Sequence, residues 1–226
     1  MTKKITIAID AMGGDNAPDK TVKGVNIFLK RNNNKNFIFN LFGDEKIIKE
    51  KISKYKIPTE SIIITNTESV VSDKETPLTA IKNSKNTSMW NCIKSQLEGS
   101  SDISLSAGNT GVLLVVSRMI LKMMDKVSKP ALAGFWPNKD GLNVVLDLGA
   151  NIECDDKNLI DFAELGSALH KSLFPNKISK VSLLNVGSEE IKGTENLKNA
   201  YKKLKSLSGD NNFIFKGYSE GNTIMS

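Results

Sequence analysis

Short apolar segments alternate with longer segments of helical periodicity along most of the chain, and this alternation constrains the fold more than any other feature. Most of the short segments are apolar throughout, which is typical of strands covered on both faces. The order predicts βαβ units and a mainly parallel sheet with helices on both sides. The predicted strands are Ile5–Ile9, Phe37–Phe42, Ser61–Thr65, Asp102–Leu105, Ala131–Phe135, Asn143–Leu146, Lys180–Leu184 and Phe213–Phe215. The predicted helices are Asp19–Lys30, Glu45–Lys54, Met89–Glu98, Val112–Met124, Lys157–Leu173 and Thr194–Leu207.

The turn with the sequence SAGNTG joins a predicted strand to an apolar predicted helix and carries no charge. Backbone N–H groups at such a helix start lack intrahelical acceptors and lie at the positive end of the helix dipole. They are suited to bind an anionic oxygen, most often that of a phosphate. The alternative is a tight turn with a Ser or Thr cap. The candidates are Asn109 for catalysis and Ser106, Gly108, Thr110 and Gly111 for phosphate binding.

The turn after the first predicted strand contains Gly13 and Gly14 between Asp10 and Pro18. It matches neither GxGxxG nor GxxxxGK[ST], which argues against dinucleotide binding and excludes a P-loop. One interpretation is that Asp15 or Asn16 caps the following helix, with Pro18 in its first turn. The other is that the carboxylates of Asp10 and Asp15 orient a basic side chain or a hydroxyl around phosphate. The candidates are Asp10 for catalysis and Gly13, Gly14, Asp15 and Asn16 for phosphate binding.

Two later strands end in similar turns. Asp147 ends a buried strand, where a carboxylate is costly unless it is hydrogen-bonded, so it is either paired with turn N–H groups or placed for function. Lys192 is the only cation within these turns, and it is either a phosphate clamp or a surface lysine beside two glutamates. The candidates are Asp147 and Lys192 for catalysis and Gly149, Asn151 and Gly187 for binding. All four turns are expected at one sheet edge, because ligands bind beyond the carboxyl ends of parallel strands.

Several classes of function are disfavoured by the residue content. The cysteines Cys92 and Cys154 and the only histidine, His170, have no metal-ligand or redox spacing, and a Ser/His/Asp triad has little support. We therefore expect no metal and no cofactor, and catalysis by positioning and charge stabilisation. The net charge of +6 rests almost wholly on dispersed lysines, which argues against nucleic acid but suits an acidic protein or anionic lipid. With no signal region and no membrane-spanning run, the chain is expected to be cytoplasmic.

The stretch Val70–Met89 is polar and lacks a regular period. It overlaps a helix-poor region, Asn66–Lys85, that is long for a loop inside a compact domain. One hypothesis is a flap over the active site, with Lys74, Lys82 or Lys85 attracting phosphate or an acidic partner. The alternative is a surface loop with solvated lysines.

Seven segments, in order, resemble the PlsX family, the phosphate acyltransferases of bacterial phospholipid synthesis. They are IAIDAMGGDNAP (Ile7–Pro18), FGDE (Phe42–Glu45), NTSMWNCI (Asn86–Ile93), SAGNTG (Ser106–Gly111), PALAGFWP (Pro130–Pro137), VLDLGANIEC (Val145–Cys154) and LLNVGSEEIKG (Leu183–Gly193). The family often has His where this chain has Asn16, so this position is not an obligatory base. The family also continues beyond the position of Ser226, which predicts that residues 1–226 form a single domain that is incomplete at its C-terminus.

The resemblance implies transfer of a fatty acyl group from acyl carrier protein to inorganic phosphate, without a metal or organic cofactor. The acyl phosphate would feed a membrane glycerol-3-phosphate acyltransferase of the PlsY type. The resemblance also implies a homodimer, loose peripheral membrane association, and an α/β/α sandwich of the phosphotransacetylase and isocitrate dehydrogenase type.

On this hypothesis, phosphate lies between Gly13–Asn16 and Ser106–Gly111 and attacks the thioester. Asn109 or Thr110 would hold its oxygens, and backbone donors near Gly149–Asn151 would stabilise the oxyanion, with Asp147 fixing that turn. The alternatives are a phosphotransacetylase-like enzyme that uses acyl coenzyme A, and an inactive truncated relic or scaffold.

Overall fold

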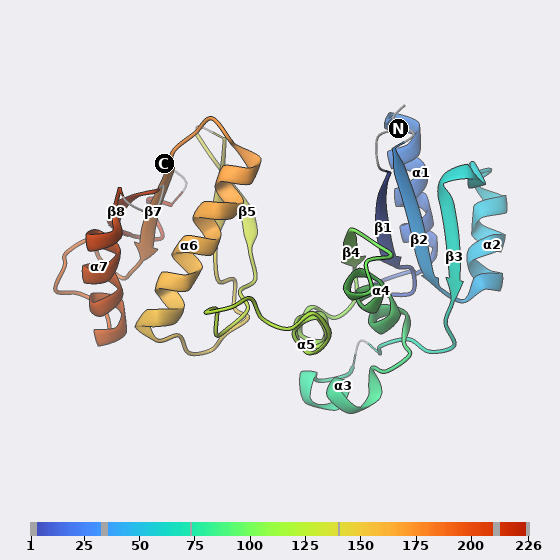
Figure 1. Cartoon of the computed structure of the whole chain (residues 1–226), viewed down its shortest axis with the longest axis horizontal. Coiled ribbons are helices and arrows are strands. Elements are labelled where there is room, and N and C mark those ends of the chain that lie inside the picture. Colours follow the sequence, from blue (N-terminus) through green and yellow to red (C-terminus); the bar gives the residue numbers. More distant parts are fainter. Residues whose placement is uncertain (1–3, 33–35, 73, 140, 210–212, 225–226) are drawn as a thin grey trace. The chain divides into compact units, whose positions relative to one another are not determined.

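Figure 1 shows the computed structural model of the chain, which describes residues 4–32, 36–72, 74–139, 141–209 and 213–224. The chain divides into two compact units, Met1–Lys122 and Met123–Ser226, called unit 1 and unit 2 below. The expected single domain over residues 1–226 stays a prediction.

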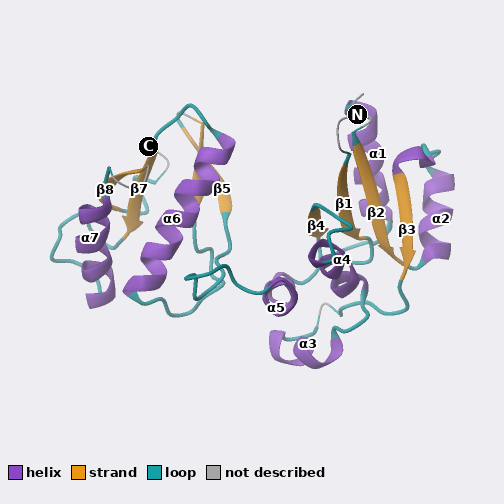
Figure 2. Ribbon diagram, in the orientation of Figure 1, coloured by secondary structure: helices purple, strands orange, loops and turns teal. Residues whose placement is uncertain are grey.

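Unit 1 contains a four-stranded sheet of β1 (Ile5–Asp10), β2 (Phe37–Gly43), β3 (Ile62–Asn66) and β4 (Ile103–Ser106). The strand order is β3-β2-β1-β4, and every pairing is parallel. The longer helices of the unit are α1 (Asp19–Arg31), α2 (Glu45–Lys54), α4 (Ser88–Leu97) and α5 (Thr110–Leu121). Figure 2 shows how these helices alternate with the strands along the chain.

Helices cover both faces of this sheet. Successive side chains of a strand point to opposite faces, so neighbouring residues of β2 pack against different helices. On one face, Leu41 packs in a core with Val22 of α1 and Ile48 of α2. On the other face, the neighbouring Phe42 packs with Cys92 of α4. The predicted βαβ arrangement with helices on both sides is therefore confirmed in unit 1.

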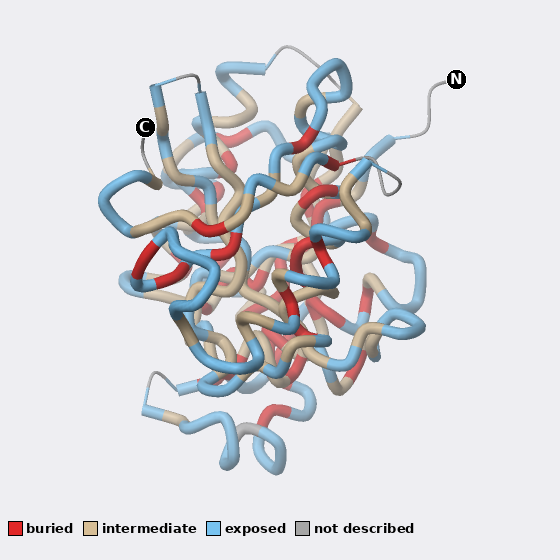
Figure 3. Tube along the Cα trace, turned by 90° about the vertical axis from the view of Figure 1, so that its left-hand side faces the viewer, coloured by how far each residue is buried: buried red, intermediate tan, exposed pale blue. Residues whose placement is uncertain are grey.

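The two outer strands are less covered than their apolar sequences predict. Ile63 of β3 and Ile103 and Leu105 of β4 are exposed. In the described part of the chain, each of these two strands has a neighbouring strand on one side only, and its side chains are partly open to solvent. Figure 3 shows that buried and exposed segments alternate along the trace, as expected for elements that present one face to a core.

Unit 2 contains two small sheets. The strands β5 (Gly134–Asn138) and β6 (Gly141–Val145) form an antiparallel pair. The strands β7 (Ser179–Leu184) and β8 (Phe213–Ser219) pair in parallel, and α7 (Glu195–Leu207) connects them. This second pair packs with α7 and α6 (Asp156–Leu173) around one apolar core.

Most predicted elements differ from the observed ones only at their ends, but two regions differ more. β5 begins at Gly134 rather than Ala131, and it pairs antiparallel with β6. The region Asn66–Lys85 contains a short helix, α3 (Pro77–Asn83), that was not predicted, after the 3-10 turn η1 (Thr59–Ser61) and β3. Within the stretch Val70–Met89, Asp73 lies outside the described residues. No helix in the described part of the chain is long and apolar enough to cross a bilayer.

Candidate functional site

The ends of β1 and β4 place Asp10 and Ser106 side by side. The two strands are adjacent and parallel, and their register pairs these two residues. The Ser106 hydroxyl donates a 2.7 Å hydrogen bond to Oδ2 of Asp10, and the Met12 N–H donates a 3.3 Å bond to Oδ1. Asp10 is only 2% exposed. Because a buried carboxylate is costly without partners, these bonds allow it to lie at the base of the turn.

The two glycine turns of unit 1 are in direct contact. A methyl group at Gly13 would lie 2.5 Å from Oδ2 of Asp10 and 2.9 Å from the backbone nitrogen of Gly108. Gly14 has φ +85°, and a methyl group there would lie 2.5 Å from the carbonyl oxygen of Ala107. Both positions therefore require glycine. Gly13 has no space for a side chain, and Gly14 lacks the space and also has a backbone conformation that favours glycine. The structure thus brings Asp10, Gly13 and Gly14 of the first turn together with Ser106 and Gly108 of the second.

The first turn of α5 presents backbone donors beside this contact. Asn109 caps the helix, since its Oδ1 accepts a 3.1 Å bond from the Val112 N–H. The first intrahelical bond runs from Leu113 to Asn109 at 2.9 Å, so the N–H groups of Thr110 and Gly111 have no acceptor within the helix. No acidic residue occupies this first turn. These two N–H groups can bind an anion at the positive end of the helix.

The side chain of Asn109 also connects α5 to the preceding polar stretch. Its Nδ2 donates a 3.0 Å bond to the carbonyl oxygen of Glu75. A methyl group at Gly111 would lie 3.1 Å from Cγ of Pro77, the first residue of α3. Glu75 was not among the residues predicted from the sequence. The contact was missed because no local sequence pattern shows that an Asn that caps a helix also binds a distant loop.

The residues Asp15 and Asn16 lie exposed beyond the glycine turn, and Asn16 has φ 59°. The N-cap of α1 is Pro18, with no side-chain cap bond. The prediction that Asp15 or Asn16 caps this helix is therefore wrong, because α1 begins only at Asp19. Their role in phosphate binding stays a prediction.

In unit 2, the carboxylate of Asp147 organises the turn after β6. Its Oδ1 accepts bonds from the N–H groups of Leu132 at 2.8 Å and Ala150 at 3.2 Å. Its Oδ2 accepts bonds from the backbone N–H of Asn151 at 2.7 Å and from its Nδ2 at 2.9 Å. Burial raises the pKa of Asp147, but these hydrogen bonds outweigh it and hold the pKa below its usual value. Gly149, with φ +86°, completes the turn.

The turn after β7 holds Lys192 against its own loop. The Lys192 ammonium lies 3.0 Å from Oε1 of Glu189, and its side chain is about half exposed (48%). The hydrogen bond from Lys192 lowers the pKa of Glu189. A methyl group at Gly187 would lie 2.9 Å from Nζ of Lys192, so glycine allows the lysine to fold over the turn. This is the contact expected of a surface lysine beside glutamates, and the phosphate clamp stays a prediction.

A hollow of about 480 Å³ lies beside these turns in unit 2, between the starts of α6 and α7. Lys129 lines it, and its ammonium donates a 2.8 Å bond to the carbonyl oxygen of Glu153. Asn196, at the start of α7, donates a 3.4 Å bond to the carbonyl oxygen of Cys154. Lys129 was not predicted from the sequence because it lies outside the glycine turns, although it directly precedes the segment PALAGFWP.

The remaining reactive side chains occupy structural positions. Burial raises the pKa of the Cys92 thiol to about 12, and burial also raises that of Cys154. Neither thiol is a ready nucleophile at neutral pH. His170 lies in the last turn of α6, with Nδ1 2.9 Å from the hydroxyl of the buried Ser179. Across the ranges that the structure describes, no three His, Cys, Asp or Glu side chains gather as a metal site requires.

Residues 5–226 match the model of a protein family described as fatty acid synthesis protein. The chain is 52% identical over 227 residues to the phosphate acyltransferase of Pelagibacter ubique (strain HTCC1062), an alignment that covers all of this chain and 66% of that protein. It is 41% identical over 217 residues to the phosphate acyltransferase of Ehrlichia ruminantium (strain Gardel), with 96% of this chain and 63% of that protein covered. The chain thus spans just under two thirds of the length of these relatives.

Two solved structures share the fold. A phosphotransacetylase from Streptococcus pyogenes matches with a TM-score of 0.69 at 14% identity, over 97% of this chain and 69% of that chain. The EutD phosphotransacetylase from Staphylococcus aureus matches with a TM-score of 0.66 at 14% identity, over 96% and 69% of the two chains. The predicted fold class, a mainly parallel sheet with flanking helices of the phosphotransacetylase type, is therefore confirmed.

Proposed function

The chain belongs to the family described as fatty acid synthesis protein, and we propose that it transfers a fatty acyl group from acyl carrier protein to inorganic phosphate. The products are acyl phosphate and the free carrier thiol. The observation that carries the proposal is the contact between the Gly13 turn and the Gly108 turn beside the N-terminus of α5. Phosphotransacetylases, which share the fold, are named for transferring an acetyl group to or from phosphate, and relatives similar in sequence are named phosphate acyltransferases.

In this mechanism, phosphate binds to the N–H groups of Thr110 and Gly111, with the Thr110 hydroxyl as a further donor. Asp10 and Ser106 hold the neighbouring turn in place through their hydrogen bond. A phosphate oxygen attacks the thioester carbonyl, the new C–O bond forms, and the C–S bond breaks with its electron pair leaving on the sulfur. A thiolate has a much lower pKa than an alkoxide, so its departure needs no strong acid.

The unit 2 candidates contribute in the same proposal as groups that stabilise negative charge. The N–H groups of Ala150 and Asn151 already bind Asp147, so the N–H of Gly149 is the donor of this turn proposed for the oxyanion. Lys192, held over Gly187, is the proposed phosphate clamp.

We further propose that the chain acts as a cytoplasmic homodimer with peripheral membrane association. Its acyl phosphate passes to a membrane glycerol-3-phosphate acyltransferase.

Substitution of Thr110 by proline tests the phosphate site directly. Proline is well tolerated at the first position of a helix but has no N–H. The preceding Asn109 is extended, with φ −59° and ψ 115°, as a residue before proline should be. We expect Thr110→Pro to lower kcat/KM for phosphate by about tenfold or more while the fold is kept. Thr110→Val retains the N–H and isolates the contribution of the hydroxyl.

The assay measures phosphate-dependent release of the carrier thiol and traps acyl phosphate with hydroxylamine. Equal rates of phosphate-dependent thiol release for Thr110→Pro and the parent chain would contradict the proposal that phosphate binds at the N-terminus of α5. Faster turnover of the same acyl chain on coenzyme A would favour the phosphotransacetylase-like alternative. No phosphate-dependent release from either carrier would favour the relic or scaffold.

The proposed flap is tested by hydrogen exchange across residues 70–89. Glu75 and Pro77 contact the start of α5, which is the position that a flap over the phosphate site requires. Exchange in this stretch should slow when phosphate and acyl carrier protein are added together. If hydrogen exchange slowed at Ser106–Gly111 alone, the phosphate site would be supported and the flap would be contradicted. Lys74, Lys82 and Lys85 would then be surface lysines.

A further inference from the structure

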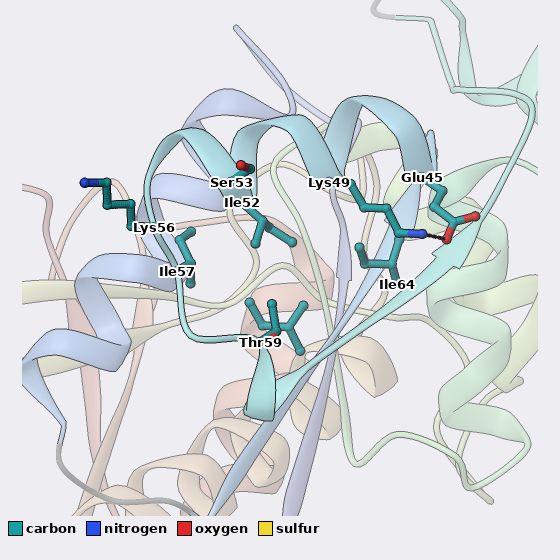
Figure 4. Close-up of a pocket in the computed structure, with 9 residues that line it drawn as sticks. Glu45, Lys49, Ile52, Ser53, Lys56, Ile57, Thr59 and Ile64 are labelled. Carbon is teal, nitrogen blue, oxygen red and sulfur yellow. Dashed lines mark ion pairs between the residues drawn. The ribbon is translucent and has the colours of Figure 1, made fainter.

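An open groove runs between α2 and the outer strand β3 in unit 1 (Figure 4), and its lining includes no residue of the two glycine turns. Its volume is about 500 Å³, which is in the range of pockets that take a ligand or a few side chains. Its apolar lining comes from Ile52 of α2, Ile57 of the following turn, and Ile62 and Ile64 of β3. Figure 4 shows Ile64 and Thr59 on the side of β3, facing Lys49 and Ile52 of α2.

The backbone of β3 offers hydrogen-bonding groups beside this groove. β3 pairs with β2 on one side, and no strand of the described chain pairs with its other side. Alternate N–H and C=O groups of such an outer strand point away from the sheet. Proteins commonly protect an outer strand with charged residues or proline, but the β3 sequence IIITN contains neither. This edge is therefore able to accept a further strand.

The rim of the groove carries a net positive charge. Glu45, Lys49 and Lys56 line it, and Glu45 forms an ion pair with Lys49, so the net charge of the lining comes from Lys56. The wider surface is also positive, because α2 with its following turn carries five lysines against the two acids Glu45 and Glu50. A second copy of this chain paired through the same edge would place two sets of these lysines close together. A segment with acidic residues would instead gain from the charge.

We propose that an extended, acidic segment of a partner protein pairs with the outer edge of β3 and places an apolar side chain in the groove between α2 and β3. Main-chain hydrogen bonds to β3 give affinity, the apolar groove selects one side chain, and the lysines select the acidic flanks. The interaction is independent of the acyl transfer chemistry, because the groove contains no residue of the phosphate site.

The test uses a short, fluorescently labelled peptide in which glutamate alternates with valine. We expect it to bind the chain and to shift the amide resonances of β3. Raising the salt concentration from low to high should weaken binding by about tenfold. The double variant Lys49→Glu, Lys56→Glu should also weaken binding by about tenfold, and Ser53→Trp should abolish it by filling the groove. Lys20→Glu, an exposed charge reversal on α1 outside the groove, is the matched control and should stay within about twofold.

Two further peptides separate strand pairing from other modes of binding. An N-methylated residue has no N–H to donate to a strand edge. Two peptides are therefore methylated at alternate residues, one at the odd and one at the even positions. Only one of the two should fail to bind, because only alternate residues of a paired strand donate to β3. Equal binding of both methylated registers would overturn strand pairing, and equal binding of a lysine–valine peptide would overturn the acidic partner. The proposal would also be overturned if none of the peptides bound. It would be overturned as well if the chain associated with itself and Ser53→Trp abolished this association, because the occupant of the groove would then be a second copy of the chain.

Discussion

Asn109 joins two parts of unit 1, because its Oδ1 caps α5 while its Nδ2 donates a 3.0 Å hydrogen bond to the carbonyl oxygen of Glu75. One side chain therefore shapes the N-terminus proposed to bind phosphate and holds the polar stretch in front of it. The two contacts use different atoms, so substitutions can separate them.

Asn109→Asp keeps the cap but replaces the amide donor with a carboxylate oxygen. We expect the helix to be retained, hydrogen exchange across residues 70–89 to become faster, and phosphate affinity to fall because a negative charge now lies at the anion site. Asn109→Ala should lose the cap as well, at a further cost of about 1 kcal/mol in the free energy of unfolding. Unchanged exchange in Asn109→Asp would show that the bond to Glu75 does not restrain the stretch.

Gly13→Ala should destabilise the chain by about 1–3 kcal/mol and abolish phosphate-dependent activity, because the added methyl group has no room between Asp10 and Gly108. Gly24→Ala is the matched control. Gly24 lies within α1, and a methyl group there would meet no neighbouring side chain within 4 Å, so alanine should stabilise this helix by about 0.5–1 kcal/mol. Urea unfolding measures both, and a tolerated Gly13→Ala would contradict the close contact of the two turns.

Ser106→Ala removes the hydroxyl donor from the buried Asp10 carboxylate, which should cost about 1–3 kcal/mol in the free energy of unfolding. Asp10→Asn replaces the charge with an amide of similar size. The double variant should be less destabilised than the sum of the two single variants, by about 1 kcal/mol. Strict additivity in this double-mutant cycle would mean that the two side chains do not act as a pair.

The stability of unit 2 should fall in acid because of Asp147. Its pKa is lower in the folded chain than its ordinary value of 3.8, so its contribution to stability is present above about pH 4 and is lost as the pH falls through the folded pKa. Asp147→Asn should be less stable than the parent chain at pH 6, and this difference should shrink as the pH falls below about 4. Guanidinium unfolding at several pH values measures this difference, and a constant difference would contradict the assignment.

Cys92 should resist alkylation in the folded chain. Burial raises its pKa to about 12, so the thiol is protonated at pH 8, and the side chain is not accessible to the reagent. Cys154 is half-buried and should react first, although more slowly than a free cysteine because its pKa is also raised. Mass spectrometry of iodoacetamide-treated protein should find label on Cys92 only after unfolding.

The sequence predicted the elements of the fold well because each strand and helix repeats its pattern over several residues. The helix Glu45–Lys54 was predicted with its observed bounds, and α7 differed by one residue. The short α3 was missed because a segment of seven residues that begins with a proline is too short to show a clear apolar period. The antiparallel pairing of β5 with β6 was not predicted, because the apolar content of two strands does not reveal their relative direction.

Candidate site residues could be found where the chemistry is local. The glycine turns were recognised from their composition, and a parallel sheet explains why the two turns of unit 1 lie at the same sheet edge. The pairing of β1 with β4 was not predicted, because the sequence pattern does not determine which strands are neighbours. The partners of Asp147 were harder to predict, because one of them, the N–H of Leu132, comes from a loop 15 residues earlier. The contact of Asn109 with Glu75 spans 34 residues and uses a backbone carbonyl, which no side-chain pattern marks.

The pairing of Asp10 with Ser106 also has a consequence for how the chain folds. The two residues are 96 positions apart, and β1 already has β2 as a neighbour on its other side. A nascent chain can therefore dock β1 on β2 early, while the turn that closes over Gly13 is still to be synthesised. Contacts of long sequence separation form late and slowly in folding. During synthesis, the Asp10 carboxylate has to remain hydrated until β4 arrives, so the proposed phosphate site can form only after residues 106–111 have left the ribosome.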